Sequence, residues 1–281
     1  MRVETISGNK FYPVLAQSYL QMGCKLPVYI QNQNKLLNVT EPLVQVVALH
    51  KMQYIYLQES DLLTYTNQLI KQNKINKSAS TGIVQLAERT QLALWALQQQ
   101  GVNHQNYYLL ENIAQSIVAL GTNHKISELF SLIPSGDAQK YLIRTFLAKL
   151  LCHKLEFTSE ATLYKTTLAS LLCDVGLYAK DLGNTNHQEK SVQILQSLKI
   201  SGDVEQIILH HHEYNDSSGT FKLSKHKIHP LAKIIRITDE FTDILFTQKI
   251  DKNVIFKNLY ELCPRKFDQQ LVRALDLCFK S

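Results

Sequence analysis

The sequence contains few of the features that mark membrane, disulfide-rich or metal-thiolate proteins. No run approaches the roughly 18 consecutive apolar residues of a membrane span, and no basic segment followed by an apolar stretch opens the chain. The five cysteines are odd in number and never spaced CxxC, so neither a disulfide framework nor a thiolate zinc site is indicated. We therefore expect a cytoplasmic protein with reduced cysteines and no membrane segment.

Basic charge is not concentrated anywhere either. The formal net charge is +6, which would suit a polyanionic partner, but the lysines are spread along the chain and form no block. Because no basic stripe interleaved with aromatic residues is visible, we expect no nucleic-acid partner. What the chain does have is 281 residues with a 45% hydrophobic composition, enough for two ordinary domains that each bury a core.

The first 72 residues alternate short apolar runs with helical ones and predict a small α/β module. Polar Asn32-Gln-Asn34 lies between two apolar runs, which is typical of a hairpin turn. The elements expected here are a hairpin of residues 27–31 and 35–39, a helix over 43–51, a strand over 54–57 and a helix over 59–70.

Residues 73–82 are polar and nearly devoid of apolar side chains, so they are predicted to be a linker and the domain boundary. Beyond them the apolar residues recur at helical spacing and strand signals are absent. The expected helices cover residues 83–97 with a stop at Gly101, 109–120 with a stop at Gly121, 138–155, 159–173, 188–198, 203–212, 229–247 and 265–279. The predicted fold class is α+β, with an all-α bundle over 83–281 whose first two helices either extend it or pair with a second subunit as a homodimer.

A histidine triplet is the strongest local feature of this helical part. His210-His-His opens a segment rich in turn residues, where an apolar helix ends. Adjacent helical residues point about 100° apart, so two neighbouring imidazoles converge on one ion only where the backbone leaves helical geometry. By itself such a triplet is more often a solvated surface feature.

Three further residues strengthen the hypothesis of a polar site. Asp174 directly follows an apolar helix and precedes Gly176, and a buried unpaired carboxylate costs several kcal/mol, so it needs a cation or strong donors. His187 opens a helix and Asp239 lies within an amphipathic one. Each is weak alone, since such residues are usually caps or water-facing, and only their order and spacing make them specific.

The combined series resembles an HD-GYP domain over roughly residues 138–281. The matching segments are Leu-Leu-X-Asp-Val-Gly, His-X-Glu, His-His-Glu-X-X-Asp-X-X-Gly and Ile-X-Pro-X-Ala-Lys-Ile-Ile-X-X-X-Asp. The resemblance implies a helical bundle that holds two or three divalent ions, iron or manganese, which activate a water for attack on the phosphodiester of cyclic di-GMP. It implies Asp174 as the bridging, catalytic aspartate. The implied metal ligands are Asp174, His187, His211, His212 and Asp239, and the implied substrate contacts are Lys233, Asp216 and Lys249.

The sequence departs from the family pattern at positions that its chemistry uses. Cys173 replaces the histidine of the HD pair, Tyr141 lies near the place of an upstream helix-borne histidine, and Leu177 replaces a phosphate-binding lysine. Cys173 would ligate a softer ion only as a thiolate, and His153 would substitute only in a different register. The segment Gly219-Thr-Phe221 replaces Gly-Tyr-Pro, and the gap from the aspartate to the next histidine is nearer to that of plain HD domains.

These departures favour a degenerate HD-GYP-like bacterial signalling protein. It would retain part of a metal site, be impaired in cyclic-di-GMP phosphodiesterase activity, and bind a cyclic dinucleotide, another phosphoester or a signalling protein. The alternative is an active metal-dependent phosphodiesterase that hydrolyses cyclic di-GMP or a related phosphoester. A third hypothesis is a bundle without metal, in which Asp174 caps a helix and the histidines are satisfied polar groups.

Overall fold

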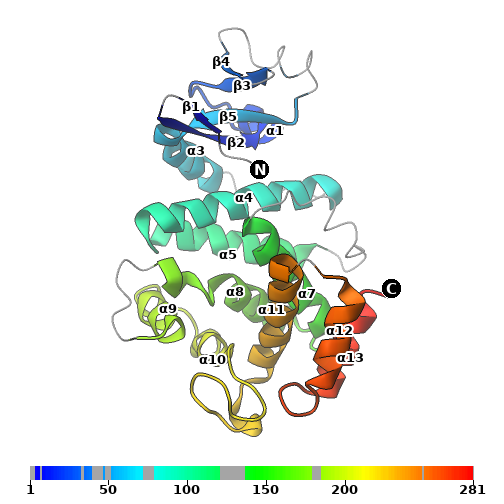
Figure 1. The fold of residues 1–281 in the computed structure, drawn as a ribbon. Coiled ribbons are helices and arrows are strands. Elements are labelled where there is room, and N and C mark those ends of the chain that lie inside the picture. Colours follow the sequence, from blue (N-terminus) through cyan, green and yellow to red (C-terminus); the bar gives the residue numbers. More distant parts are fainter. Residues whose placement is uncertain are drawn as a thin grey trace.

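The computed structural model of the chain has the predicted α+β architecture. It describes residues 4–6, 8–32, 35–39, 47, 52–71, 79–120, 137–178, 185–248 and 250–280. A small sheet module lies at one end and helices make up the rest (Figure 1). None of the helices in these ranges is long and apolar enough to cross a membrane.

The N-terminal module is a five-stranded antiparallel sheet with the strand order β1-β2-β5-β3-β4. Its elements are β1 (Glu4–Ile6), β2 (Asn9–Leu15), α1 (Ala16–Met22), β3 (Tyr29–Asn32), β4 (Lys35–Asn38), β5 (Tyr54–Gln58) and α3 (Glu59–Lys71). The predicted hairpin, the strand at 54–57 and the helix at 59–70 are confirmed. The helix expected over 43–51 lies outside the described residues except for Val47, which is helical. Elements β1, β2 and α1 were not predicted from the sequence as separate elements.

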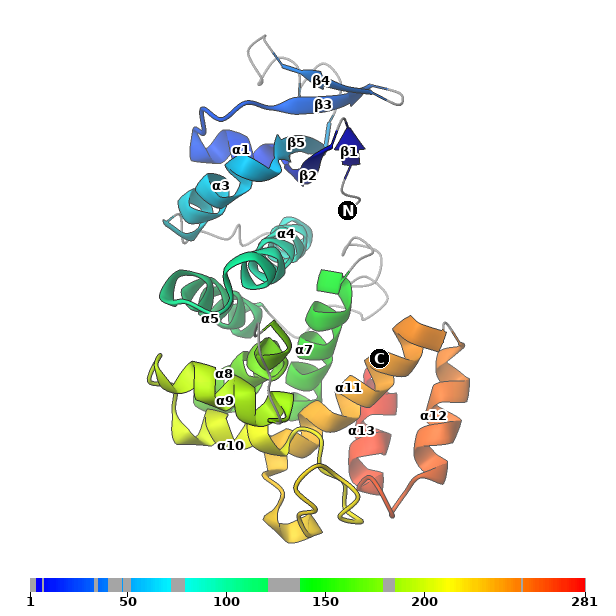
Figure 2. The same cartoon turned by 60° about the vertical axis from the view of Figure 1, so that its left-hand side comes forward.

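Helix α4 (Ala79–Gln100) joins the module to the bundle. Leu92, Trp95 and Ala96 on one side belong to the core of the module, whereas other apolar residues of α4 belong to the bundle core. Its buried Glu88 accepts hydrogen bonds from the Leu15 backbone N–H at 2.6 Å and the Tyr65 hydroxyl at 2.9 Å. Both views of the ribbon show α4 between the sheet and the helices that follow it in the chain (Figure 2).

The position of α4 corrects part of the predicted linker. Residues 79–82 are helical rather than linker, and residues 73–78 lie outside the described ranges. The polar first turn of an amphipathic helix has the same composition as a linker, so composition alone could not separate the two.

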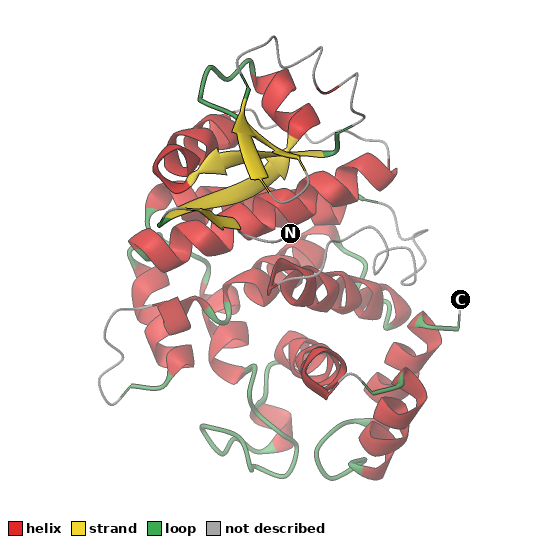
Figure 3. Ribbon diagram, turned by 45° about the horizontal axis from the view of Figure 1, so that its top comes forward, coloured by secondary structure: helices red, strands yellow, loops and turns green. Residues whose placement is uncertain are grey.

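One hydrophobic core runs through the helical part, from α4 to the last helix. The helices after α4 are α5 (His104–Ala119), α7 (Asp137–Lys154), α8 (Glu160–Leu172), α9 (His187–Gln196), α10 (Gly202–His210), α11 (Pro230–Gln248), α12 (Lys252–Glu261) and α13 (Gln269–Cys278), with 3-10 turns η1 (Val175–Tyr178) and η2 (Lys225–Lys227) (Figure 3). Because buried residues of α4 and α5 share this core with α7 and α8, these two helices extend the bundle.

The predicted helices are present with their ends shifted by one to five residues. The largest shift is at the start of α5, which begins at His104 and not at residue 109. Two further differences stand out. The helix expected over 265–279 begins only at Gln269, after a turn. Helix α12 was not predicted, and it contributes Ile255, Phe256 and Leu259 to the core.

Candidate metal centre

Four of the five predicted metal ligands converge where α8, α9 and α10 meet. Asp174 follows α8, His187 is the first residue of α9, and His211 and His212 follow α10. One ligand atom from each of these residues lies within 4.8 Å of the others. We call these residues the four-residue group. Asp239 of α11 is not part of it.

Close packing of η1 against α9 sets the position of His187. A Cβ on Gly176 would lie 2.2 Å from the His187 carbonyl oxygen, so a glycine is required for this approach. The Ser191 hydroxyl accepts from the Gly176 N–H at 2.8 Å and donates to the Cys173 carbonyl at 2.9 Å. These bonds tie the start of α9 to the end of α8 and so bring His187 beside Asp174.

The imidazoles of the group differ in what their two nitrogens contact. Buried His211 donates from Nδ1 to the Ile208 carbonyl at 2.5 Å, which leaves a lone pair on Nε2, 3.7 Å from Asp174 Oδ1. His187 Nε2 lies 3.7 Å from the same oxygen and 3.4 Å from His211 Nε2. His212 Nε2 lies 3.1 Å from His187 Nε2.

Arg144 of α7 lies on the other side of Asp174, a position that was not predicted from the sequence. Its side chain is 1% exposed. Nη1 donates to Asp174 Oδ2 at 2.6 Å and to Asp239 Oδ1 at 2.8 Å, and Nη2 donates to the Ser170 carbonyl at 2.5 Å. One guanidinium therefore bridges the two buried carboxylates. A charged residue within the apolar run of α7 was the available signal, because a buried cation needs acidic partners.

The charges around Asp174 keep it ionised. Burial acts to raise the pKa of its carboxyl, but the Arg144 guanidinium and the His211 imidazole outweigh burial and hold that pKa well below its usual range. Its two oxygens have separate roles: Oδ1 faces the imidazoles and Oδ2 accepts from Arg144.

Asp239 is bound by two arginines. Its Oδ1 accepts from Arg144, and its Oδ2 accepts from Arg236 Nη1 at 3.2 Å. Burial acts to raise the pKa of Asp239, yet the guanidinium groups hold it below the ordinary value. Arg236 also donates to the Tyr214 hydroxyl at 2.5 Å and pairs with Glu240.

The four-residue group fits one divalent ion. Three imidazole nitrogens and one carboxylate oxygen form a donor set suited to zinc, iron or manganese. A second ion between Asp174 and Asp239 does not fit, because the Arg144 guanidinium lies within hydrogen-bond distance of both carboxylates.

Cys173 and His153, which were considered as substitute ligands, and Tyr141, which lies near the place of a family histidine, are outside the four-residue group. Cys173 is buried, its thiol contacts the Ser170 carbonyl at 3.5 Å, and burial raises its pKa well above the ordinary value, which disfavours a thiolate ligand. The Tyr141 hydroxyl lies 3.4 Å from that of Tyr178. His153 is nine residues after Arg144, about 14 Å further along α7.

The predicted substrate contacts are occupied by other partners or lie outside the described residues. Lys233 Nζ is 3.4 Å from Asp268. Asp216 accepts from the Ser218 N–H at 3.1 Å and so shapes its own loop. Lys249 lies outside the described residues. Leu177 is 53% exposed and carries no charge at the position where the resemblance to HD-GYP domains predicts a phosphate-binding lysine.

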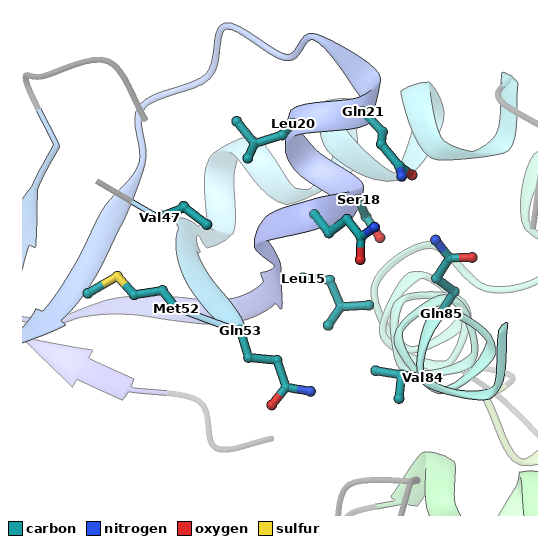
Figure 4. Close-up of a pocket in the computed structure, with 10 residues that line it drawn as sticks. Leu15, Ser18, Leu20, Gln21, Val47, Met52, Gln53, Val84 and Gln85 are labelled. Carbon is teal, nitrogen blue, oxygen red and sulfur yellow. The ribbon is translucent and has the colours of Figure 1, made fainter. Parts of the chain in front are cut away.

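A cavity of about 530 Å³ offers a second candidate site between the N-terminal module and α4. Figure 4 shows Leu15, Ser18 and Gln21 facing Val84 and Gln85 of α4 across it. The lining residues are apolar or carry neutral amides and a hydroxyl, with no charged side chain among them. This cavity therefore lacks the cationic groups that an anionic phosphoester needs.

Comparison with known proteins identifies the family. Residues 109–255, just over half of the chain, match the family model of the HD domain. The chain therefore belongs to the HD domain family, as its motifs predicted. A similar solved structure is that of Bd1817, a HDG"Y"P protein from Bdellovibrio bacteriovorus. It has 17% sequence identity and a TM-score of 0.66, over 96% of this chain and 100% of that one. That likeness concerns the fold. No curated protein matches the sequence.

Proposed function

We propose that this protein is a bacterial signalling protein of the HD family that keeps a single-ion site and is impaired in cyclic-di-GMP phosphodiesterase activity. The observation that carries the proposal is the Arg144 guanidinium between Asp174 and Asp239.

Two-metal phosphodiester hydrolysis needs ions on both sides of a bridging carboxylate, since they stabilise the attacking and the leaving oxygen. Here Arg144 takes the second oxygen of Asp174 and one oxygen of Asp239. A guanidinium stays protonated and neutralises both carboxylates, but it cannot lower the pKa of a bound water as a metal ion does. The four-residue group would hold one ion, which when bound supplies Lewis-acid polarisation of a phosphoryl oxygen.

The expected ligand is a cyclic dinucleotide or another phosphoester, with a signalling protein as a further partner. The four-residue group is consistent with such a ligand, because a divalent cation held there would coordinate phosphate oxygens. Leu177 supports binding without efficient turnover, since no lysine stands at its position to stabilise charge that builds up during the reaction.

The alternative is an active phosphodiesterase that works with one ion. It is favoured by the convergence of Asp174 and three imidazoles within 4.8 Å, because a single ion with open positions can also activate a water.

Metal analysis and a turnover assay test the proposal on the purified full chain. After incubation with Mn²⁺ and removal of free ions, we expect about one equivalent of bound metal. It should be lost in His211→Ala and kept in the control His226→Ala, an exposed histidine of η2. Cyclic-di-GMP hydrolysis, followed by chromatography, should stay near background. Turnover clearly above background that His211→Ala abolishes would support the active enzyme instead, and a metal-free protein would favour the bundle without metal.

A further inference from the structure

The cavity between the N-terminal module and α4 has a neutral lining, although the chain has a formal net charge of +6. Its volume of about 530 Å³ lies within the range of about 300–1,000 Å³ that is usual for small-molecule sites. None of the described residues that line it carries a charge. Because an ionised group is costly to desolvate without a partner of opposite charge, a ligand that fits this cavity is uncharged.

Polar side chains line the cavity from both sides. Ser18 of α1 and Gln85 of α4 are each 5% exposed, and Figure 4 shows Gln85 extending from α4 towards Ser18 and Gln21. Gln21 and Gln53 also line the cavity and are exposed. An amide offers N–H donors and a carbonyl acceptor, and a hydroxyl also does both. The polar edge of a matching ligand therefore presents donors and acceptors together.

Aliphatic side chains form the rest of the lining. Leu15, the last residue of β2, lies opposite Val84 of α4 (Figure 4). A flat ring system packs its apolar faces against such side chains and turns its polar edge towards the amides. A purine base has this combination, because its edge carries a donor beside an acceptor and a glutamine amide forms paired hydrogen bonds with adenine N6 and N7.

Hydrogen bonds within the protein hold the walls of the cavity in place. Glu88 of α4 accepts from the Leu15 backbone N–H at 2.6 Å and from the Tyr65 hydroxyl at 2.9 Å. The Ala16 backbone N–H donates to the Gln53 carbonyl at 3.0 Å. These bonds connect α4, the start of α1 and the residue before β5, so the cavity is formed before a ligand enters. Such preorganisation lowers the entropic cost of binding.

We propose that this cavity binds an uncharged purine base. The edge of the base pairs with the amides of Gln85 and Gln21, and its faces pack between Leu15 and Val84. The site is separate from the four-residue group, since a phosphoester needs cationic partners that this cavity lacks. The inference therefore goes beyond the proposed function and depends neither on a metal ion nor on turnover.

Calorimetric titration of the purified full chain with adenine and with hypoxanthine tests the proposal, with a chelator present to keep the four-residue group free of metal. At least one of these bases should bind with a Kd below about 1 mM, and weaker binding by both would overturn the proposal. Purine-6-carboxylate, which carries a negative charge on the same edge, should bind at least about tenfold more weakly than the better base. Equal affinity would contradict the role of the neutral lining and would also overturn the proposal.

Gln85→Leu tests the polar contact, because leucine nearly keeps the volume of the side chain and removes its hydrogen-bonding groups. It should weaken binding of the base by at least about tenfold. The control is Gln98→Leu, which changes an exposed glutamine of the same helix outside the cavity and should alter the Kd by less than about twofold. A Gln85→Leu variant that binds the base as well as the wild type would refute the assignment.

Photo-cross-linking of the unmodified chain covers the case in which Gln85→Leu fails to fold. After irradiation with 8-azidoadenine, mass spectrometry should find the label in peptides that contain residues 15–21, 52–53 or 84–85, and excess adenine should prevent the labelling. Labelling confined to other peptides would reject the site. High cyclic-di-GMP hydrolysis would reject the proposed function and leave this inference standing, since neither measurement uses turnover.

Discussion

Replacing Arg144 by methionine tests the central feature of the site. The change leaves the carboxylates of Asp174 and Asp239 buried without the guanidinium that contacts both, at 2.6 Å and 2.8 Å. Removing one partner of a buried ion pair costs about 3–5 kcal/mol. A second argument gives a similar loss of stability. Without Arg144 one of the two carboxyls becomes neutral by binding a proton, and raising its pKa from about 4 to 7 corresponds to about 4 kcal/mol.

The assay is urea unfolding at pH 7 with a chelator present, compared with Lys140→Met. Lys140 lies one turn before Arg144 on α7 and makes a partly exposed pair with Asp243, so its loss should cost no more than about 1 kcal/mol. The deficit of Arg144→Met should also grow from pH 4 to pH 7. In the wild type the lowered pKa values of Asp174 and Asp239 give stability that is present above about pH 4. In the variant one of these carboxyls has a raised pKa in the folded state, so the folded variant loses stability as the pH rises from 4 towards that pKa. A deficit below about 1 kcal/mol that does not vary with pH would refute the reasoning.

Three further predictions concern a histidine, a helix end and a glycine. Burial lowers the pKa of His212 to about 3, so between about pH 6.5 and that pH a proton binds to this histidine only in the unfolded chain. As the pH falls through this range, the free energy of unfolding of the metal-free protein should therefore decrease by up to about 1.4 kcal/mol per pH unit. His212→Gln should flatten this slope in urea titrations, and equal slopes in the two proteins would contradict the assignment. Lys149 donates to the Ile117 carbonyl at 2.8 Å and to the next carbonyl at the end of α5. Lys149→Met should lower the free energy of unfolding by about 2–3 kcal/mol in the same assay. A loss under about 0.5 kcal/mol would show that water satisfies these carbonyls in place of the ammonium. Gly176→Ala should cost at least about 1–3 kcal/mol and weaken Mn²⁺ binding by displacing His187, while Gly202→Ala, where an added Cβ meets nothing within 4 Å, should change neither.

Local sequence signals accounted for much of the fold. Apolar spacing located α7, α8 and α11 to within one or two residues, because a helix that packs on a core must repeat its apolar side chains at the helical period. The hairpin of β3 and β4 was also predicted, since its polar turn is a local feature. Short strands such as β1, with no buried residue, carry too weak a pattern to be found this way.

The sequence by itself determined which residues form the candidate site, through the order of Asp174, His187 and the paired histidines along predicted helix ends. It did not determine which side chain of α7 meets Asp174. Tyr141 and Arg144 lie one turn apart on that helix, and the choice depends on how α7 is placed against α8 and α11. Likewise, the donor that faces His212 comes from α11, 24 residues away. Tertiary packing decided these contacts, because they depend on helix positions relative to one another, which no local pattern encodes.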